Sequence, residues 1–221
     1  MTPPRAVVFD FDGVLADTEG LHLRAFQDVF ADRGWTLDRA DYFERYLGYS
    51  DRDLVVAFAA DVNHSLSPVD VTAIVTDKAR RYDQRLSSGS VLFDGAAAAI
   101  ARLTAAEYRL AIASGSFHAE IAAILAANNL GHAFDAIVGA DDVRRAKPAP
   151  DPYAAAVEAL GVAASHAVAI EDSHWGVAAA KAAGMRAIAV TTTTGAEELR
   201  QADVVLGSIG EVSVEQVLAM A

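Results

Sequence analysis

The feature that most constrains the fold is a short apolar run, Ala6-Val7-Val8-Phe9, that leads directly into two carboxylates, Asp10 and Asp12. Such a run predicts a strand covered on both faces, as in a parallel sheet. Because strand side chains two residues apart point the same way, Asp10 and Asp12 are expected to project together from the carboxyl edge of that sheet. Gly13 then allows a sharp turn. A solvated Asp-x-Asp-Gly turn is the alternative interpretation.

The remainder of the chain indicates the fold class, because from Asp94 onward predicted helices alternate with short apolar runs. Strands interleaved with helices imply right-handed crossovers and a doubly wound parallel sheet of the α/β class. The first strand must belong to the same sheet. Further strands are expected at 110–113, 136–138, 167–170, 187–190 and 204–206, with helices at 96–106, 117–129, 175–183 and from 151 onward.

Residues between the first strand and residue 88 follow helical patterns instead. The segment 18–33 has apolar residues at helical spacing, and the segments Ser50–Asp53 and Ser67–Asp70 have the capping pattern that begins a helix. Ser87–Ser90 is expected to be a flexible connection. The sequence therefore predicts an all-α cap domain, residues 16–88, inserted into an α/β core formed by residues 1–15 and 89–221.

Composition excludes several classes of function. The chain has 221 residues, a formal net charge of -12 and no cysteine. The negative charge makes nucleic acid and anionic membranes unfavourable partners, and the lack of cysteine excludes disulfides, thiolate nucleophiles and thiolate zinc sites. The sequence has no signal-peptide pattern and no apolar stretch that could span a bilayer. We expect a soluble cytoplasmic protein. The sequence leaves the oligomeric state open, and a monomer is the working expectation.

Three further loops carry polar side chains where a predicted strand ends. Ser114-Gly115-Ser116 precedes a helix, and a hydroxyl beside free N–H groups at a helix N-terminus can bind an anion. Lys147 lies in a proline-rich loop, where a compact ammonium can bind a phosphoryl oxygen. Glu171-Asp172-Ser173 follows the strand at 167–170. Taken singly, these loops also have ordinary explanations as a turn, a solvated lysine and a helix N-cap.

Taken together, the loops predict a metal and phosphate site. The carboxyl ends of parallel strands lie at one edge of a sheet, so Asp10, Asp12 and Asp172 are expected to converge there. Mg²⁺ prefers oxygen ligands, and a cation would offset the repulsion between the acids. Lys147 would offset the repulsion between Asp10 and an incoming anion. We therefore expect Mg²⁺ and a small phosphorylated molecule at this edge.

In this order, the four loops resemble the motifs of the haloacid dehalogenase superfamily, whose members form aspartyl phosphates. Asp10-Phe11-Asp12-Gly13-Val14-Leu15 resembles the first motif, Ser114 the second, Lys147 with Pro148 the third, and Glu171-Asp172-Ser173 the fourth. The helical insertion resembles the small cap of the branch that contains β-phosphoglucomutase and many sugar-phosphate phosphatases. The resemblance covers nearly the whole chain and implies a Rossmann-like core.

The resemblance also implies a role for each matching residue. Asp10 is the implied nucleophile, and Asp12 is the implied general acid and base that protonates the leaving alcohol and later deprotonates water. The dehalogenases of the superfamily lack an aspartate at the position of Asp12, so its presence favours phosphate esters. The implied ligands are Ser114, Gly115 and Lys147 for phosphate, and Asp10, the Asp12 carbonyl, Glu171 and Asp172 for Mg²⁺.

The expected function is Mg²⁺-dependent hydrolysis of a small phosphate ester such as a sugar phosphate. A hexose-phosphate mutase of the β-phosphoglucomutase type is the first alternative, and a non-catalytic binding protein on the same fold is the second. His22 and Lys78 match cap positions of the mutase-like branch that contact substrate. An exposed helix position is the alternative for both residues and the preferred one for Lys78.

One departure from the mutase pattern favours the phosphatase. In the mutase an arginine directly follows the serine of a segment that resembles Gly48-Tyr49-Ser50, whereas here Asp51 intervenes before Arg52. A mutase must hold a second phosphate in the cap while its substrate turns over. A displaced Arg52 weakens that function, and the acidic Asp51 would repel the phosphate.

Overall fold

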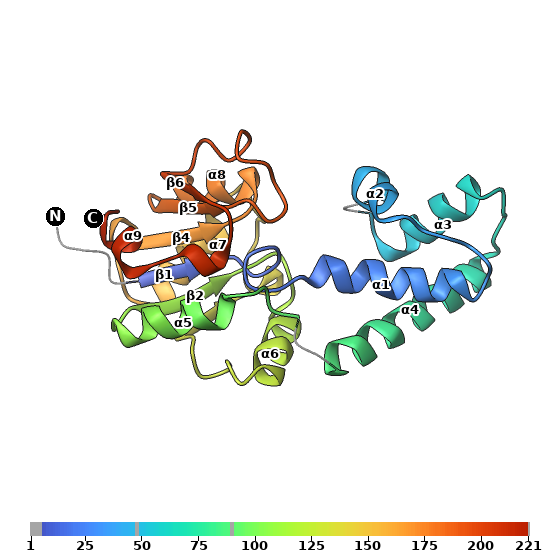
Figure 1. The fold of residues 1–221 in the computed structure, drawn as a ribbon, viewed down its shortest axis with the longest axis horizontal. Coiled ribbons are helices and arrows are strands. Elements are labelled where there is room, and N and C mark those ends of the chain that lie inside the picture. The colour runs from blue at the N-terminus through green and yellow to red at the C-terminus, as the bar shows by residue number, and fades with distance from the viewer. Residues whose placement is uncertain (1–5, 47–48, 89–90, 221) are drawn as a thin grey trace. The chain divides into compact units, whose positions relative to one another are not determined.

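The structure, a computed structural model, describes residues 6–46, 49–88 and 91–220. The chain divides into two compact units. The core unit is Met1–Asp17 together with Val91–Ala221, and the helical unit is Thr18–Ser90 (Figure 1). The helical unit is therefore an insertion in the core unit. The chain leaves the core unit after Asp17 and returns to it at Val91.

The core unit contains one sheet of six strands in the order β3-β2-β1-β4-β5-β6 (Figure 1). All neighbouring strands are parallel, and β1 lies in the middle between β2 and β4. The predicted doubly wound parallel sheet is confirmed, and each strand lies within one residue of its expected bounds. These are β1 Ala6–Phe9, β2 Arg109–Ala113, β3 Ala136–Val138, β4 Ala167–Glu171, β5 Arg186–Val190 and β6 Val204–Leu206.

Helices follow the strands of the core unit, as the alternation predicted. The short C-terminal helix α9 was not predicted from the sequence. The N-cap of α7 is Pro150, and Asp151 is the first residue of the helix, as expected for a helix from 151 onward. The helices are α5 Ala96–Ala105, α6 His118–Ala127, α7 Asp151–Ala159, α8 His174–Ala182 and α9 Val214–Leu218.

The two faces of the sheet differ in the size of their side chains. On the face that packs against α7 and α8, the strands present mostly alanine: Ala6, Val8, Ala111, Ala113, Ala167, Ala169, Ala187 and Ala189. These small side chains leave room for Tyr153 of α7, which is fully buried. Strand alternation also gives a direction to the residues at the strand ends. Asp10 continues the row of Val8, and Glu171 continues the row of Ala169, both on this alanine face.

Two helices of the helical unit, α3 and α4, begin where the capping patterns predicted. Ser50 caps α3 by accepting the Asp53 N–H at 3.1 Å, and Ser67 and Asp70 bond each other's backbone N–H groups where α4 begins. The predicted connection was partly wrong, because Ser87 and Ser88 belong to α4, while Gly89 and Ser90 lie outside the described residues. The helices are α1 Thr18–Ala31, α2 Arg39–Asp41, a π-helical turn Tyr42–Tyr46, α3 Asp51–Asp61 and α4 Pro68–Ser88.

An aromatic core holds the helical unit together. Phe30 of α1 stacks on Phe58 of α3 with ring centroids 4.5 Å apart, and Phe26 and Trp35 pack beside Phe30. Both stacked rings are buried. In the parts of the chain that the structure describes, none of the helices combines the length and the hydropathy that a transmembrane span requires.

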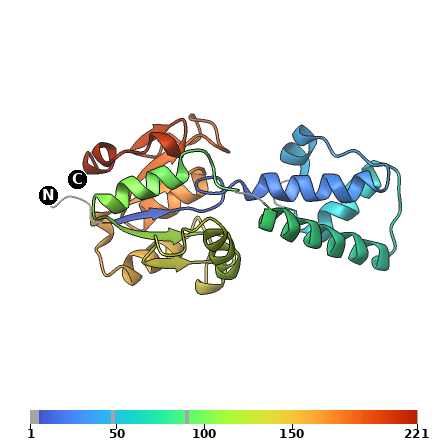
Figure 2. The same ribbon diagram turned by 60° about the horizontal axis from the view of Figure 1, so that its bottom comes forward.

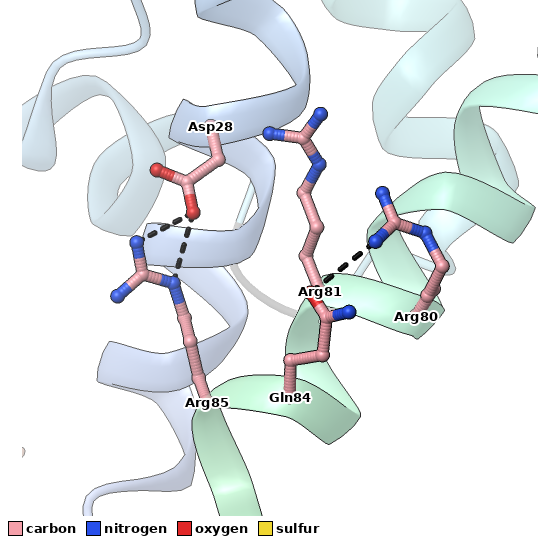
Figure 3. A pocket seen from close by; sticks show the side chains of 5 residues that line it. All are labelled: Asp28, Arg80, Arg81, Gln84 and Arg85. Atoms are coloured by element: carbon pink, nitrogen blue, oxygen red, sulfur yellow. Dashed lines mark hydrogen bonds and ion pairs between the residues drawn. The ribbon is translucent and has the colours of Figure 1, made fainter. Parts of the chain in front are cut away.

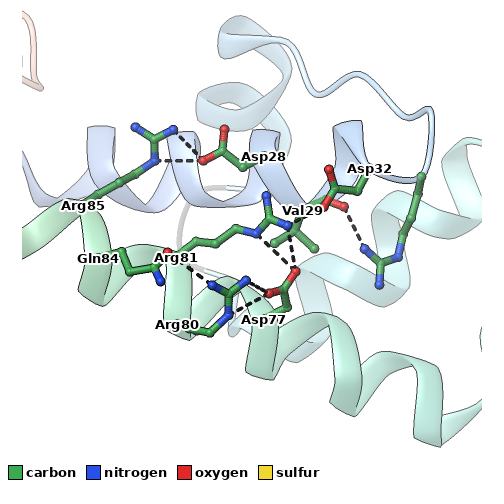
Figure 4. Close-up of polar contacts among 9 residues, drawn as sticks. Asp28, Val29, Asp32, Asp77, Arg80, Arg81, Gln84 and Arg85 are labelled. Atoms are coloured by element: carbon green, nitrogen blue, oxygen red, sulfur yellow. Dashed lines mark hydrogen bonds and ion pairs between the residues drawn. The ribbon is translucent and has the colours of Figure 1, made fainter.

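Ion pairs connect α4 to α1, which lie side by side (Figures 1 and 2). Arg85 donates from Nε to Asp28 at 2.9 Å, and Arg81 pairs with Asp32. A cavity of about 490 Å³ beside them is lined by Asp28, Arg80, Arg81, Gln84 and Arg85 (Figure 3). Each of its guanidinium groups already has a carboxylate partner (Figure 4). We therefore interpret this cluster as an interhelical contact.

Replacement of Phe30 by alanine should lower the free energy of unfolding of the helical unit by about 3 to 5 kcal/mol, because it removes a buried ring and leaves a cavity. Replacement of Arg85 by glutamine breaks a half-exposed ion pair and should cost no more than about 1 kcal/mol. Urea titration followed by circular dichroism measures both values. Equal losses would contradict the aromatic core as the main contact that stabilises α1.

Candidate active site

Asp10 lies at the end of the central strand and faces a lysine. Its backbone N–H donates to the Ile170 carbonyl at 2.8 Å, which extends the pairing of β1 with β4 by one residue. Its Oδ1 lies 2.8 Å from Lys147 Nζ, and the side chain is 11% exposed. Lys147 belongs to the loop before α7 and reaches Asp10 on the alanine face of the sheet. The structure therefore brings together two of the predicted site residues.

Lys147 also contacts Glu171, the residue that ends β4. The distance from Lys147 Nζ to Glu171 Oε1 is 2.6 Å, and Nζ lies 5.0 Å from the centroid of the Tyr153 ring. Asp10 and Glu171 come from neighbouring strands and lie on the same face of the sheet, so one ammonium can serve both carboxylates. Lys147 thus cross-links the ends of β1 and β4.

Both carboxylate oxygens of Glu171 already accept several hydrogen bonds. Oε1 accepts from Lys147 and from the Tyr153 hydroxyl at 2.9 Å. Oε2 accepts from the Asp172 N–H at 3.0 Å, and from the N–H and the hydroxyl of Ser173 at 3.1 and 3.0 Å. The side chain is completely buried and fills the space above Gly176. These bonds favour a positioning role for Glu171. They leave its carboxylate oxygens less available to a metal ion than its predicted role as a ligand requires.

Asp172 packs against the loop that follows β1. A Cβ on Gly13 would lie 2.0 Å from Asp172 Oδ2, and the φ of Gly13 is +83°, so glycine is required there for two reasons. The Thr193 hydroxyl donates to Asp172 Oδ2. Asp172 is not the N-cap of α8, because Ser173 takes that role by accepting the Gly176 N–H at 3.0 Å. The alternative explanation of Asp172 as a helix cap is therefore wrong.

Asp12 points to the other side of β1. Its Oδ2 accepts from the Ser116 hydroxyl at 2.6 Å and from the Ser114 hydroxyl at 3.1 Å, both in the loop after β2. Because β1 ends at Phe9, strand alternation does not extend to Asp12, and the expectation that Asp10 and Asp12 project together was wrong. The two carboxylates contact different partners, and they are close enough for the charge of Asp12 to raise the pKa of Asp10.

The loop after β2 differs in detail from the predicted anion site. Ser114 is buried and its hydroxyl donates to Asp12, while Gly115 is exposed. Two of the N–H groups expected to be free already have acceptors. The Ser116 N–H donates to Ser114 Oγ at 3.0 Å, and the His118 N–H donates to Asp141 at 2.9 Å. An anion at this loop would therefore depend more on the Ser114 and Ser116 hydroxyls than on the start of α6.

The electrostatics of the site follow from the burial of several acids beside one base. Burial raises the pKa of Asp10 well above its usual range, and the charges of Glu171, Asp172 and Asp12 act in the same direction while Lys147 opposes them. Burial and the charge of Glu171 raise the pKa of Asp172 to about 7. Burial opposes the charge on Lys147, but attraction to Asp10 and Glu171 outweighs it and raises the pKa of this ammonium. Three buried carboxyl groups therefore accompany one ammonium at this edge.

The excess of carboxylates fits a divalent cation. Asp10, Glu171 and Asp172 each offer an oxygen, and these oxygens lie within 4.8 Å of one another. Hard oxygen donors of this kind suit Mg²⁺. Of the expected ligands, the Asp12 carboxylate stands outside this group because it faces the serines, which is compatible with a contribution from its backbone carbonyl. The donor set thus consists of Asp10 and Asp172, with Glu171 largely engaged by other groups.

The predicted cap residues lie in the helical unit, and two of them touch. Lys78 Nζ lies 2.6 Å from His22 Nδ1. The interpretation of Lys78 as an exposed helix residue is wrong, since its side chain is 2% exposed. Arg52 is exposed, and the Lys78 ammonium pairs with the preceding residue, Asp51. Gly48, part of the segment compared with the mutase, lies outside the described residues.

Sequence reasoning missed three residues that contact the site. Tyr153 bonds Glu171 from α7, Thr193 bonds Asp172 from the segment after β5, and Ser116 bonds Asp12. Ser116 was visible only as part of a turn. Strand-end position was a possible signal for Thr193, because β5 is a neighbour of β4 in the sheet. Tyr153 had no sequence signal, because it looks like an ordinary apolar position of a helix.

The fold and the site together define the class of this protein. A family model described as haloacid dehalogenase-like hydrolase matches residues 7–190. The chain therefore belongs to the haloacid dehalogenase-like hydrolase family, and the resemblance drawn from its four motifs is confirmed.

Individual relatives are similar over most of their length. Protein CbbY of Cereibacter sphaeroides is 36% identical over 215 residues, which cover 94% of this chain and 93% of the relative. Fructose-1-phosphate phosphatase YqaB of Escherichia coli K12 is 29% identical over 188 residues, which cover 83% of this chain and 95% of the relative. A crystal structure of mutant CbbY from Rhodobacter sphaeroides in complex with xylulose-(1,5)bisphosphate has a TM-score of 0.76 at 34% identity, covering 97% of this chain and 99% of that chain.

Replacement of Gly176 by alanine should lower the free energy of unfolding by about 1 to 3 kcal/mol, because the new Cβ would lie 1.7 Å from Glu171 Oε1 and the Glu171 carboxylate is held on all sides. Helix propensity alone would predict a gain of roughly 1 kcal/mol at this helical position. Gly131→Ala is the control, since a Cβ there meets nothing within 4 Å. Denaturant titration compares the two variants, and a gain in Gly176→Ala would contradict the described position of Glu171.

Proposed function

We propose that this chain is a phosphatase that hydrolyses a small phosphorylated metabolite through an aspartyl-phosphate intermediate, with Mg²⁺ as its cofactor and sugar phosphates as its substrate class. The observation that carries the proposal is the buried pairing of Asp10 with Lys147, 2.8 Å apart, beside the further carboxylates of Glu171 and Asp172. A carboxyl group that is buried beside a lysine cannot be explained as part of a solvated turn.

In the proposed reaction, Asp10 is the nucleophile. One Asp10 oxygen attacks phosphorus and the bond from phosphorus to the ester oxygen breaks, while Asp12 donates a proton to the leaving alcohol. Asp12 then takes a proton from the water that attacks the phosphorus of the aspartyl phosphate and releases phosphate. The Ser114 and Ser116 hydroxyls donate to the Asp12 carboxylate and so orient it for proton transfer. The same two hydroxyls can donate to phosphoryl oxygens.

Lys147 and the proposed Mg²⁺ neutralise the charge of the phosphoryl group in the proposed reaction. Lys147 offsets the charge of the incoming phosphoryl group, and Glu171 with Tyr153 keeps the ammonium in place. Asp10 and Asp172, with the carbonyl of Asp12, are the proposed ligands of Mg²⁺. When bound, Mg²⁺ acts as a Lewis acid that neutralises charge on the phosphoryl oxygens.

The names of the relatives support the substrate class. YqaB is named as a fructose-1-phosphate phosphatase, and the mutant CbbY structure contains a sugar bisphosphate. We further propose that the core unit carries out catalysis and that side chains of the helical unit, the predicted cap domain, select the substrate. We also propose that the protein is a monomer located in the cytoplasm.

Replacement of Asp10 by asparagine should lower phosphate release by at least about a thousandfold, because an amide oxygen does not form the acyl phosphate. The fold should persist, since Lys147 keeps its pair with Glu171. Release of phosphate from a panel of sugar phosphates, with a melting curve for each protein, tests this. Turnover near the wild-type rate would exclude Asp10 as the nucleophile, and isomerisation faster than release in the wild type would identify a mutase instead.

Chelation by EDTA should abolish turnover, and added Mg²⁺ should restore it. In Asp172→Asn the Mg²⁺ concentration for half-maximal activity should rise by more than about tenfold, because a charged ligand is lost. Tyr153→Phe is the matched control, since it removes only the hydroxyl that donates to Glu171 and keeps the ring beside Lys147, so this concentration should stay unchanged. Activity that survives chelation would refute the role of the metal.

A further inference from the structure

The N-cap of helix α6 cannot accept a hydrogen bond with its side chain. The N-cap residue is Phe117, and an apolar ring leaves the first N–H groups of the helix without a local acceptor. The acceptor comes from the loop after β3 instead, because the His118 N–H donates to Asp141 Oδ1 at 2.9 Å. The start of α6 therefore depends on a residue of another loop.

The loop after β3 forms a turn, residues 139–142, which a second carboxylate stabilises. We call this segment the β3 turn. The Gly139 N–H donates to Asp142 Oδ2 at 2.8 Å, and the same oxygen lies 3.2 Å from His118 Nδ1. The hydrogen bond from Gly139 and the neighbouring His118 lower the pKa of Asp142, so its carboxylate is charged at neutral pH. Asp142 therefore holds the β3 turn and contacts the first residue of α6.

The β3 turn also fixes the backbone of the loop after β2, residues 114–118, which we call the serine loop. The Ala140 N–H donates to the Ser116 carbonyl at 2.9 Å. The Ser116 N–H donates to Ser114 Oγ at 3.0 Å, and the Ser116 hydroxyl donates to Asp12 Oδ2 at 2.6 Å. The bond that reaches Asp12 thus starts from a backbone that the β3 turn holds in place.

The β3 turn and the serine loop approach closely because Gly139 has no side chain. A Cβ at Gly139 would lie 2.5 Å from the His118 nitrogen and 2.9 Å from the Ser116 carbonyl oxygen, both of them backbone atoms. Gly139 is buried, whereas Asp141 and Asp142 are exposed. An effect of these two carboxylates on Asp12 would therefore pass through the contact between the two loops.

We propose that Asp141 and Asp142 are positioning residues for proton transfer, because they fix the serine loop and, through Ser116, orient the Asp12 carboxylate toward the leaving oxygen. The inference rests on the proposed phosphatase function, in which Asp12 protonates the leaving alcohol. A general acid acts only within hydrogen-bond reach of the atom that it protonates. A displacement of about 1 Å is enough to slow such a step roughly a hundredfold.

Two esters separate proton transfer from the rest of the reaction. The alcohol of a sugar phosphate needs a proton to leave, whereas 4-nitrophenolate leaves without one. Asp142→Ala should therefore lower kcat/KM on the best sugar phosphate of the panel at least about tenfold more than on 4-nitrophenyl phosphate. Asp142→Asn should restore the ratio of the two values, because its amide oxygen still accepts the Gly139 N–H. Equal losses on both esters would overturn the inference, since a purely structural defect predicts them.

Three further variants test the path from the carboxylates to the serine loop. Asp141→Ala removes the acceptor at the start of α6 and should lower the ratio as well. Gly139→Ala keeps both carboxylates but forces the loops apart, so it should act in the same direction. Glu158→Ala changes an exposed acid of α7 and should leave the ratio unchanged. Melting curves establish that each variant folds, and an unchanged ratio in folded Asp141→Ala and Gly139→Ala would overturn the inference.

Amide hydrogen exchange separates this inference from the proposed function, because it requires no turnover. In Asp142→Ala the Ala140 and His118 amides should exchange at least about tenfold faster than in the wild type, while the amides of β1 and β4 keep their rates. Unchanged exchange at both amides would overturn the positioning role even in an active enzyme. Absence of phosphate release from every ester would refute the phosphatase, and the exchange rates would still show whether the two carboxylates fix the serine loop.

Discussion

The cluster of buried acids at the carboxyl edge of the sheet depends on the ammonium of Lys147, which pairs with both Asp10 and Glu171. Burying these acids beside Asp172 is unfavourable unless positive charge accompanies them. The loop before α7 must therefore deliver a lysine to the end of β1. The crossover of α7 onto the alanine face accomplishes this, because small strand side chains leave space for Tyr153, which bonds Glu171 beneath the ammonium.

The central position of β1 divides the chemistry between its two neighbours. Asp10 faces Lys147 and Glu171 on the side of β4, whereas Asp12 faces Ser114 and Ser116 on the side of β2. In the proposed reaction, Lys147 neutralises the charge of the phosphoryl group on the side of β4. Asp12 transfers protons to the leaving alcohol and from water on the side of β2. The helical unit follows the same electrostatic rule with Lys78, whose buried charge is matched by Asp51. Both units thus contain a buried lysine that pairs with a carboxylate.

Local patterns predicted much of the fold. The short apolar runs indicated the six strands to within a residue, and the strands β2, β4 and β5 each extend by one charged residue beyond the apolar run. Ser50 and Ser67 predicted two helix starts from local capping patterns. The pattern failed where local signals were weak or misleading, as at α9 and at the serines that end α4. It also failed at Asp12, because alternation stops where the strand does.

The order and type of the residues were enough to predict a doubly wound parallel sheet, a helical insertion and four polar loops at strand ends. Periodicity and turn chemistry are properties of neighbours along the chain, so they can be read without a fold. Side-chain partnerships could not: Tyr153 with Glu171, Thr193 with Asp172 and Asp51 with Lys78 join residues 18 to 27 positions apart. Such contacts depend on how helices pack on the sheet and on one another, and they appear only once the chain has folded.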